Sequence, residues 1–154
     1  MAIQGKTDID QLLAKSLKEI AVRRPVEKIT IKEITDKAGV IRPTFYNHFQ
    51  DKFELIEWII RTELLEPVEP LIRNDMIIEA MVLLFTNIEK DKAFYSQLVK
   101  MEGPVKFHDI AKKCVREVLL DKQNSVIINF IRITQHIPVI RIFFMAFHKN
   151  IRKF

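Results

Sequence analysis

A dense run of hydrogen-bonding side chains lies in the first third of the chain. Arg42, Thr44, Tyr46, Asn47 and His48 stand within seven positions. Arginine can contact a phosphate or guanine, threonine a base edge or a thymine methyl group, and asparagine can pair with adenine. Tyrosine and histidine suit phosphate oxygens, which fix position without reading sequence. On one short helix, these side-chain types indicate contacts to double-stranded DNA.

A capped helix and a glycine turn precede this run. Thr30 followed by Glu33 is a capping box, in which side chains satisfy the free amides at a helix start. Apolar residues then recur at helical spacing and predict a short amphipathic helix over residues 31–37. Gly39 falls just past its last turn, where a residue without a Cβ adopts the left-handed conformation most easily.

A second short helix is predicted from about Arg42 to Phe49. Pro43 stands in its first turn, where the missing amide is not needed. Phe45 and Phe49 are one turn apart and predict an inward-facing stripe. Two such helices joined by a turn of about three to four residues have helix-turn-helix geometry, with the second helix free to enter a major groove.

The next helix is predicted to begin at Asp51, with Glu54 completing another capping box. Lys52 lies in its first turn, where a cation and exposed amides together can hold a phosphate. The alternative interpretation of the whole region is a helical bundle with ordinary solvated polar residues.

Residues 7–65 resemble the DNA-binding domain of the TetR family of bacterial transcriptional regulators. The resemblance lies in Ala38-Gly39-Val40, Thr44-Phe45-Tyr46, His48-Phe49 and Lys52. The segment from Thr44 to Lys52, followed by Trp58, is most similar to regulators of dihydroxyacetone kinase operons. Two residues depart from the family pattern: Ile41, where serine is usual, and Pro43, where glycine or alanine is usual. Ile41 cannot cap the helix with its side chain, so base readout can differ while phosphate contacts persist.

The residues predicted to contact DNA lie on both helices and at the start of the next one. They are Thr30, Lys32, Arg42, Pro43, Thr44, Tyr46, Asn47, His48 and Lys52.

Composition predicts a folded all-α protein. Of the 154 residues, 48% are hydrophobic and only three are glycine, so long helical-period runs dominate. The net charge of +5 comes entirely from residues 126–154, because residues 1–125 hold 20 basic and 20 acidic side chains. Overall basicity therefore gives no argument for DNA binding. A single cysteine, Cys114, excludes an internal disulfide, and the first residues have no signal-peptide pattern, so we expect a cytoplasmic location.

Three segments are expected along the chain. Residues 7–66 form a three-helix head and its connecting helix, with a capping box at Thr7 and Asp10 and a first helix ending near Arg23. Residues 74–125 form a short helical body, separated from the head by a boundary over residues 66–73, with Pro67 and Pro70. Its helices are expected to start after Asn74 or Asp75, after Asp91 and near Val105.

The body carries aromatic and methionine side chains that, as the resemblance implies, could line an effector pocket. They are Trp58, Phe85, Phe94, Tyr95, Met101 and Phe107. At helical spacing such residues are more often plain core. Cys114 is interpreted as a small buried side chain, and His108 with Asp109 as a solvated surface pair.

Residues 126–154 differ in composition from the rest of the chain. They contain no acidic residue and no glycine, and Pro138 interrupts any long helix. In relatives this region supplies the helices of the dimer interface. The tail is either altered, as by a changed reading frame, or a buried partner of the body helices. A third possibility is a segment on an anionic membrane surface. A bilayer crossing needs about 20 apolar residues, which the apolar run interrupted by Arg141 does not supply.

The resemblance implies a transcriptional regulator that binds DNA as a homodimer and responds to a small-molecule effector or a coactivator protein. Neither a cofactor nor a metal is expected, and no enzymatic function is predicted, because no phosphate loop, metal-ligand cluster or nucleophile motif is present. The alternative is a helical interaction module whose head has lost DNA binding because dimerisation is impaired.

Overall fold

The computed structural model describes the backbone of residues 2–102 and 104–120, and the side chains of residues 8–102 and 104–114. The head contains α1 (Ala2–Ala21), the 3₁₀ turn η1 (Val26–Lys28), α2 (Ile31–Ala38) and α3 (Arg42–Tyr46). Helix α4 (Lys52–Ile60) runs directly into the π-helical turn η2 (Arg61–Leu65). The body contains α5 (Glu69–Arg73), α6 (Ile77–Lys90), α7 (Lys92–Val99) and α8 (Phe107–Leu120). The described residues form helices and no strands, which confirms the all-α prediction.

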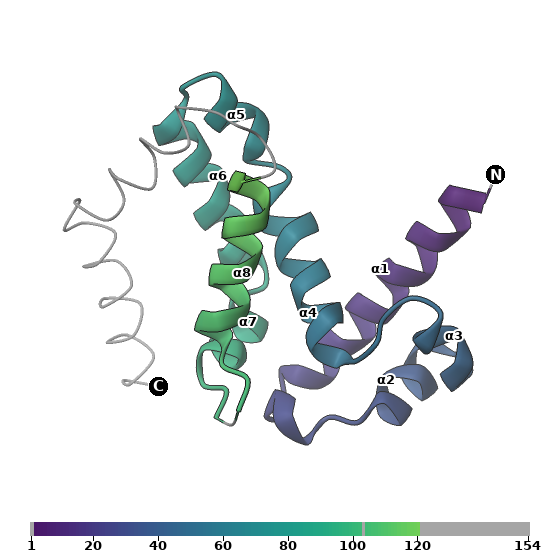
Figure 1. The fold of residues 1–154 in the computed structure, drawn as a ribbon. Coiled ribbons are helices and arrows are strands. Elements are labelled where there is room, and N and C mark those ends of the chain that lie inside the picture. The colour runs from purple at the N-terminus through teal and green to yellow at the C-terminus, as the bar shows by residue number, and fades with distance from the viewer. Residues whose placement is uncertain (1, 103, 121–154) are drawn as a thin grey trace.

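Helix α4 connects the head to the body. In Figure 1, α1, α2 and α3 lie at one end, and α4 leads from them towards α6, α7 and α8. Helix α4 packs against α1 on the head side and against α8 on the body side. Helix α4 thus joins the three helices of the head to the body through packed contacts on both sides.

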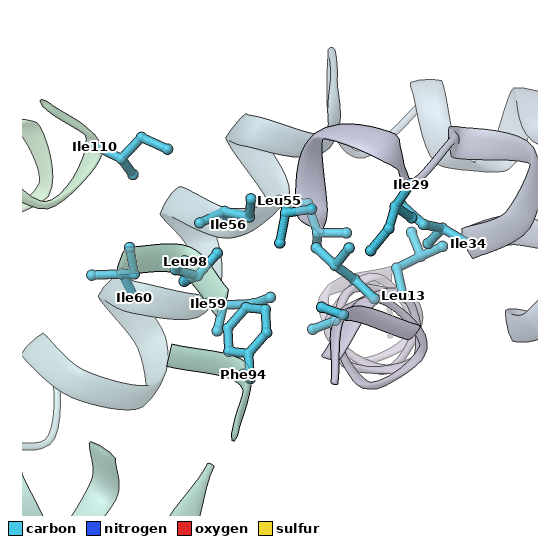
Figure 2. Close-up of a cluster of buried hydrophobic side chains, with 14 of the residues drawn as sticks. Leu13, Ile29, Ile34, Leu55, Ile56, Ile59, Ile60, Phe94, Leu98 and Ile110 are labelled. Carbon is cyan, nitrogen blue, oxygen red and sulfur yellow. The ribbon is translucent and has the colours of Figure 1, made fainter. Parts of the chain in front are cut away.

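One apolar core extends through both regions. Figure 2 shows Leu13 and Ile34 of the head near Leu55 of α4, with Ile59 and Phe94 continuing the cluster towards the body. Leu55, Ile56 and Ile59 of α4 have no exposed surface. The wide apolar surface predicted for this helix is explained by its two sets of neighbours. A smaller cluster of Val68, Ile72 and Ala80 lies between α5 and α6.

The first predicted helix start is wrong. Helix α1 begins at Ala2 and passes through Thr7 without a break, so Thr7 and Asp10 do not form a helix-starting box. Asp10 is a mid-helix residue whose carboxylate contacts His48. Helix α3 is also shorter than predicted, since it ends at Tyr46 and the chain continues to Phe49 as a turn closed by Phe45 O.

The body differs from prediction at two helix starts. Helix α6 begins at Ile77 after Met76, with no side-chain cap, while the Asn74 amide donates to Pro70 O at 2.8 Å. Asp91 does precede α7, but its carboxylate accepts from a lysine instead of capping the helix. Asn74 and Asp91 therefore form hydrogen bonds outside the helices that they were predicted to cap.

The segment expected as a boundary is largely helical. Helix α5 (Glu69–Arg73) has Pro70 in its first turn, where proline is tolerated. The predicted tail, residues 126–154, lies outside the described residues. Within the described part of the chain, no helix is long and apolar enough to cross a membrane.

Candidate nucleic-acid interface

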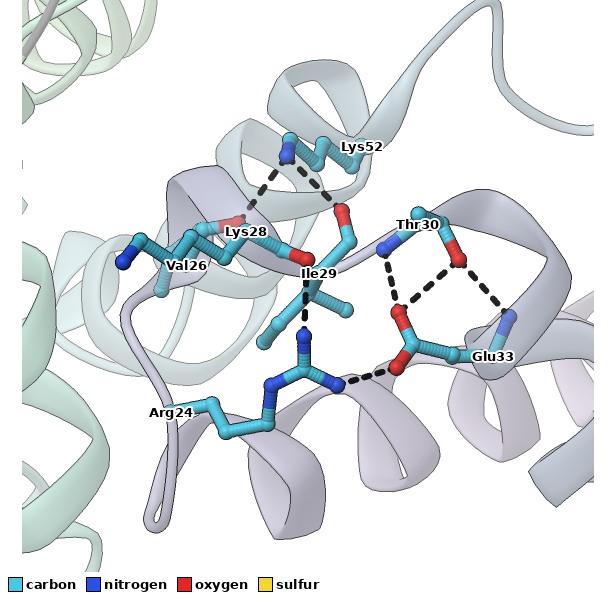
Figure 3. A network of polar contacts seen from close by, with 7 residues as sticks. All are labelled: Arg24, Val26, Lys28, Ile29, Thr30, Glu33 and Lys52. Carbon is cyan, nitrogen blue, oxygen red and sulfur yellow. Dashed lines mark hydrogen bonds and ion pairs between the residues drawn. The ribbon is translucent and has the colours of Figure 1, made fainter.

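The start of α2 is held by the predicted capping box. Thr30 Oγ1 accepts from Glu33 N at 3.2 Å, and Thr30 N donates to Glu33 Oε2 at 2.8 Å. Arg24 forms an ion pair with Glu33 and also donates to Lys28 O (Figure 3). The Thr30 amide and hydroxyl, followed by Arg24, lower the pKa of Glu33. The box therefore fixes α2 and links it to the end of α1.

The turn into α3 is built on Gly39. It has φ 69° and ψ 28°, the left-handed conformation expected from the sequence. Val40 N then donates to Thr35 O, and Ile41 is extended with φ −84° and ψ 153°. Thr44 N donates to Ile41 O at 3.0 Å, which closes the first turn of α3.

The inner side of α3 is anchored by aromatic packing. Phe45 is fully buried and Phe49 is 4% exposed, with ring centroids 5.9 Å apart. Phe49 meets Trp58 of α4 edge-on, at 6.2 Å. The predicted inward stripe is thus confirmed, and the opposite side of α3 is left open.

That open side presents Arg42, Pro43, Tyr46 and Asn47, all exposed, with Thr44 half-buried. Arg42 donates to Tyr46 Oη at 3.3 Å, and its guanidinium carbon lies 5.9 Å from the Tyr46 ring centroid. Among the described residues, no carboxylate forms an ion pair with Arg42. Its charge is therefore available to an anion or a base.

His48 lies inside the head instead of on this open side. Its Nδ1 is 2.6 Å from Asp10 Oδ1, and the two side chains are only 12% and 11% exposed. This contact joins the turn after α3 to α1. The sequence assigned His48 to a phosphate oxygen, and that contact stays a prediction; in this structure its Nδ1 is paired with Asp10.

Lys52 is also engaged within the protein. Its Nζ donates to the carbonyl oxygens of Val26, Glu27 and Ile29 at 2.9, 2.7 and 2.8 Å (two of these bonds are drawn in Figure 3). Burial lowers the pKa of the ammonium, with the charges of Glu27 and neighbouring acids opposing. All three N–H groups are used, so Lys52 must leave these carbonyls to hold the phosphate that the sequence predicted.

Thr30 and Lys32 lie on α2, away from the run on α3. Thr30 is committed to the capping box, and the exposed Lys32 pairs with Asp36 one turn later. The start of α4 is capped by Asp51, which accepts from Phe53 N and Glu54 N. Glu54 accepts from Gln50 N, so it does not complete a box with Asp51 as predicted.

A cavity of about 270 Å³ lies beside the end of α3. Its lining comes from α1, the turn after α3, α4 and the first residue of η2: Asp10, His48, Phe49, Glu54, Glu57, Trp58 and Arg61. Of the six predicted effector residues, Trp58 lines this cavity. Phe94, Tyr95 and Met101 are buried in the core, and Phe85 and Phe107 are half-buried. An effector contact from any of the six remains a prediction.

Polar contacts that the sequence did not indicate join the head to the body. Lys18 of α1 donates to Glu63 of η2 at 2.7 Å and to Asp91 at 2.8 Å. Tyr95 donates to the other carboxylate oxygen of Glu63 at 3.4 Å, and Asn87 donates to Glu63 O at 3.1 Å. These residues are up to 73 positions apart, so local spacing gives no sign of them.

Other chemistry is sparse in the described residues. They contain no group of three or more His, Cys, Asp and Glu placed to hold a metal ion. His108 and Asp109 form the exposed pair predicted, 3.4 Å apart. Cys114 is fully buried, as predicted.

Comparison with known proteins agrees with this geometry. Residues 13–59 match the family model described as bacterial regulatory proteins, tetR family. The chain is also similar to the HTH-type dhaKLM operon transcriptional activator DhaS of Lactococcus lactis subsp. lactis (strain IL1403), with 25% identity over 88 residues. The aligned part is 57% of this chain and 47% of the Lactococcus protein, so it spans about half of that relative. The matched residues include α2, α3 and the packed parts of α1 and α4. Residues 13–59 of this chain are therefore similar to the tetR family of bacterial regulatory proteins, and they hold the two short helices of the candidate site.

Proposed function

We propose that the chain is a DNA-binding transcriptional regulator that places α3 in a major groove. The observation that carries the proposal is the two-sided arrangement of α3. Phe45 and Phe49 fix its inner side in the core, while Arg42, Tyr46 and Asn47 are exposed on the other. An anchored short helix with a free polar face is the geometry that reads base edges. The family of residues 13–59 supports the same conclusion.

The exposed residues divide by chemistry. Arg42 suits guanine or a phosphate, and Asn47 suits the hydrogen-bonding edge of adenine. Thr44 and Pro43 offer small groups to a base edge, and Tyr46 suits a phosphate oxygen. His48 and Lys52 act through the protein, by holding the turn and the start of α4 in place.

We further propose that two copies bind together. A dimer would place two α3 helices about 34–36 Å apart, on half-sites one helical turn from each other. The body, residues 74–125, would then bind an effector or a partner protein that favours one spacing over another. The similar Lactococcus protein is named as an operon activator, so the regulation we propose includes activation as well as repression. Such a regulator acts where the chromosome is, in the cytoplasm.

Selection from random duplex DNA by the purified full-length chain tests the proposal. We expect one sequence to be enriched, with an affinity that falls steeply as salt rises. Arg42→Ala should weaken binding to the enriched site by about five-fold to 150-fold, since a good arginine–guanine pair is worth about 1–3 kcal/mol. Lys100→Ala removes an exposed cation of the body and serves as the matched control.

Asn47→Ala provides a second, independent test of the same site. It should change the preferred base at one position and leave the salt dependence unchanged, because it removes no charge. A folded full-length chain that enriches no sequence and retards no DNA at low salt would contradict the proposal. It would favour the helical interaction module instead.

A further inference from the structure

Ile41 stands at a position where another residue type would stabilise the fold more. Its side chain is 69% exposed, more than the other exposed large apolar side chains of the head, which are Leu12, Val22 and Tyr46. It also holds the N-cap position of α3, where no side-chain hydrogen bond satisfies the free amides. Serine, threonine, asparagine or aspartate would stabilise the helix at this position. Among the described residues the isoleucine therefore contributes neither core packing nor capping, so its side chain is free to contact another molecule.

The backbone holds Ile41 in a defined place. Gly39 makes the left-handed turn before it, and the carbonyl of Ile41 accepts from Thr44 N at 3.0 Å. The residue directly precedes α3, and the first residues of a recognition helix are those that contact base edges. A β-branched side chain also has few χ1 rotamers to lose when it makes a contact.

The chemistry of Ile41 selects one kind of base. Its side chain has no donor or acceptor, so it cannot read the hydrogen-bonding pattern of a base edge. In the major groove, the thymine C5-methyl group is the apolar group that base pairs display. Pro43 is exposed in the first turn of α3, so two of the three residues from Ile41 to Pro43 are apolar, with the cation of Arg42 between them.

We propose that Ile41 is a specificity-determining residue that packs on a thymine methyl group, so each half-site carries a thymine opposite the start of α3. The inference rests on the proposed function and names a feature of the DNA that the chain would select. It adds Ile41 to the predicted contact residues.

Replacement of thymine by uracil tests the contact directly, because it removes only the methyl group. The full-length chain is titrated, by fluorescence anisotropy, with its selected duplex and with duplexes that carry uracil at one thymine at a time. We expect one position per half-site at which uracil weakens binding about four-fold, the value for one buried methyl group. In Ile41→Ala, uracil and thymine at that position should bind equally, to within about 1.5-fold.

Ile78→Ala is the matched control. Ile78 is 77% exposed on α6 in the body, so this variant removes an equally accessible isoleucine away from α3. It should retain the four-fold preference for thymine. The uracil scan with unaltered protein needs no variant, so it stands even if Ile41→Ala fails to fold.

The outcomes separate the two proposals. If the chain selects a duplex but uracil has no effect at any position, the thymine contact is overturned and the regulator proposal stands. If uracil weakens binding equally in the original chain and in Ile41→Ala, another residue reads the methyl group and the assignment to Ile41 is overturned. If no duplex is selected, both proposals fail.

Discussion

Lys52 shows how the environment of one side chain changes its expected role. A lysine in the first turn of α4 suits a phosphate, yet its ammonium donates to three carbonyl oxygens at the end of η1. Val26 O also accepts from Ile29 N at 3.1 Å, so the lysine adds a second bond there as well as the bonds to Glu27 O and Ile29 O. The contact ties α4 to the loop that precedes α2, and it is in place before DNA binds.

We expect Lys52→Met to destabilise the fold. The methionine keeps the apolar part of the side chain but removes the lysine bonds to Glu27 O and Ile29 O, at a cost of about 1–3 kcal/mol. Urea unfolding should show this loss, while Lys32→Met, which breaks an exposed pair with Asp36, should cost less than about 1 kcal/mol. If Lys52→Met were as stable as the original and reduced the salt slope of DNA binding by about one, the ammonium would be a phosphate ligand.

At the scale of elements, the capping box of α2 can be isolated by one substitution. Thr30→Ala removes the hydroxyl that accepts from Glu33 N and should lower the free energy of unfolding by about 1 kcal/mol. Thr30→Ser retains that oxygen and should restore most of the loss. The comparison is made by urea unfolding at neutral pH. Equal stability of the alanine and serine variants would show that the box contributes little.

Gly39 gives a second test at this scale, on the turn between α2 and α3. A Cβ at this position would meet no heavy atom within 4 Å, so the cost of a side chain lies in the backbone conformation alone. We expect Gly39→Ala to lose about 1–2 kcal/mol and Gly39→Asn less, because asparagine tolerates the left-handed region. Thermal unfolding should rank the stabilities glycine, asparagine, alanine. Stability unchanged in the alanine variant would contradict the assigned φ.

Local patterns predicted the elements that depend on local bonds. The Thr30–Glu33 box, the Gly39 turn and the Asp51 cap each join residues two to four positions apart, and the structure has all three. The inward Phe45–Phe49 stripe follows from the same helical period. These features are decided by side chains that must satisfy neighbouring amides or bury one face of a helix.

The rest depends on residues far apart in sequence. Asp10 and His48 are separated by 38 positions, and Lys52 is 23 to 26 positions from its carbonyls. No spacing rule indicates such pairs. The sequence therefore predicts contacts to DNA phosphates for His48 and Lys52, which the chemistry of both side chains also permits. The start of α1 differs from the prediction because Thr7 has the sequence pattern of a cap, whereas the helix already begins at Ala2.

At the scale of the whole molecule, head and body share a charged network as well as a core. Lys18, Glu63, Asp91 and Tyr95 connect α1, η2 and α7. Burial tends to lower the pKa of Lys18, but hydrogen bonds to Asp91 and Glu63 and their charges outweigh it and raise the pKa above 10.5. Burial, reinforced by the charge of Glu63, also raises the pKa of Tyr95 far above 10.0.

This network predicts an alkaline limit to stability. Above about pH 10 the unfolded chain loses protons from Lys18 and Tyr95 that the folded chain retains, so stability present below that pH is lost as pH rises. Tyr95→Phe should remove part of this dependence and flatten the curve of unfolding free energy between about pH 9 and pH 11. Urea unfolding across this range measures it. Tyr46→Phe, which changes an exposed tyrosine, is the control. Parallel curves for Tyr95→Phe and the original chain would contradict the network's role.

The internal contacts of the head carry a thermodynamic consequence. With Lys52 on its carbonyls and His48 on Asp10, the elements around α3 are already ordered in the free chain. Association with DNA then requires no folding of the head, so its heat-capacity change should correspond to the contact area alone. Titration calorimetry at several temperatures would give a small negative value for the original chain. Asp10→Ala should make that value more negative, because the turn after α3 would then have to become ordered during each binding event.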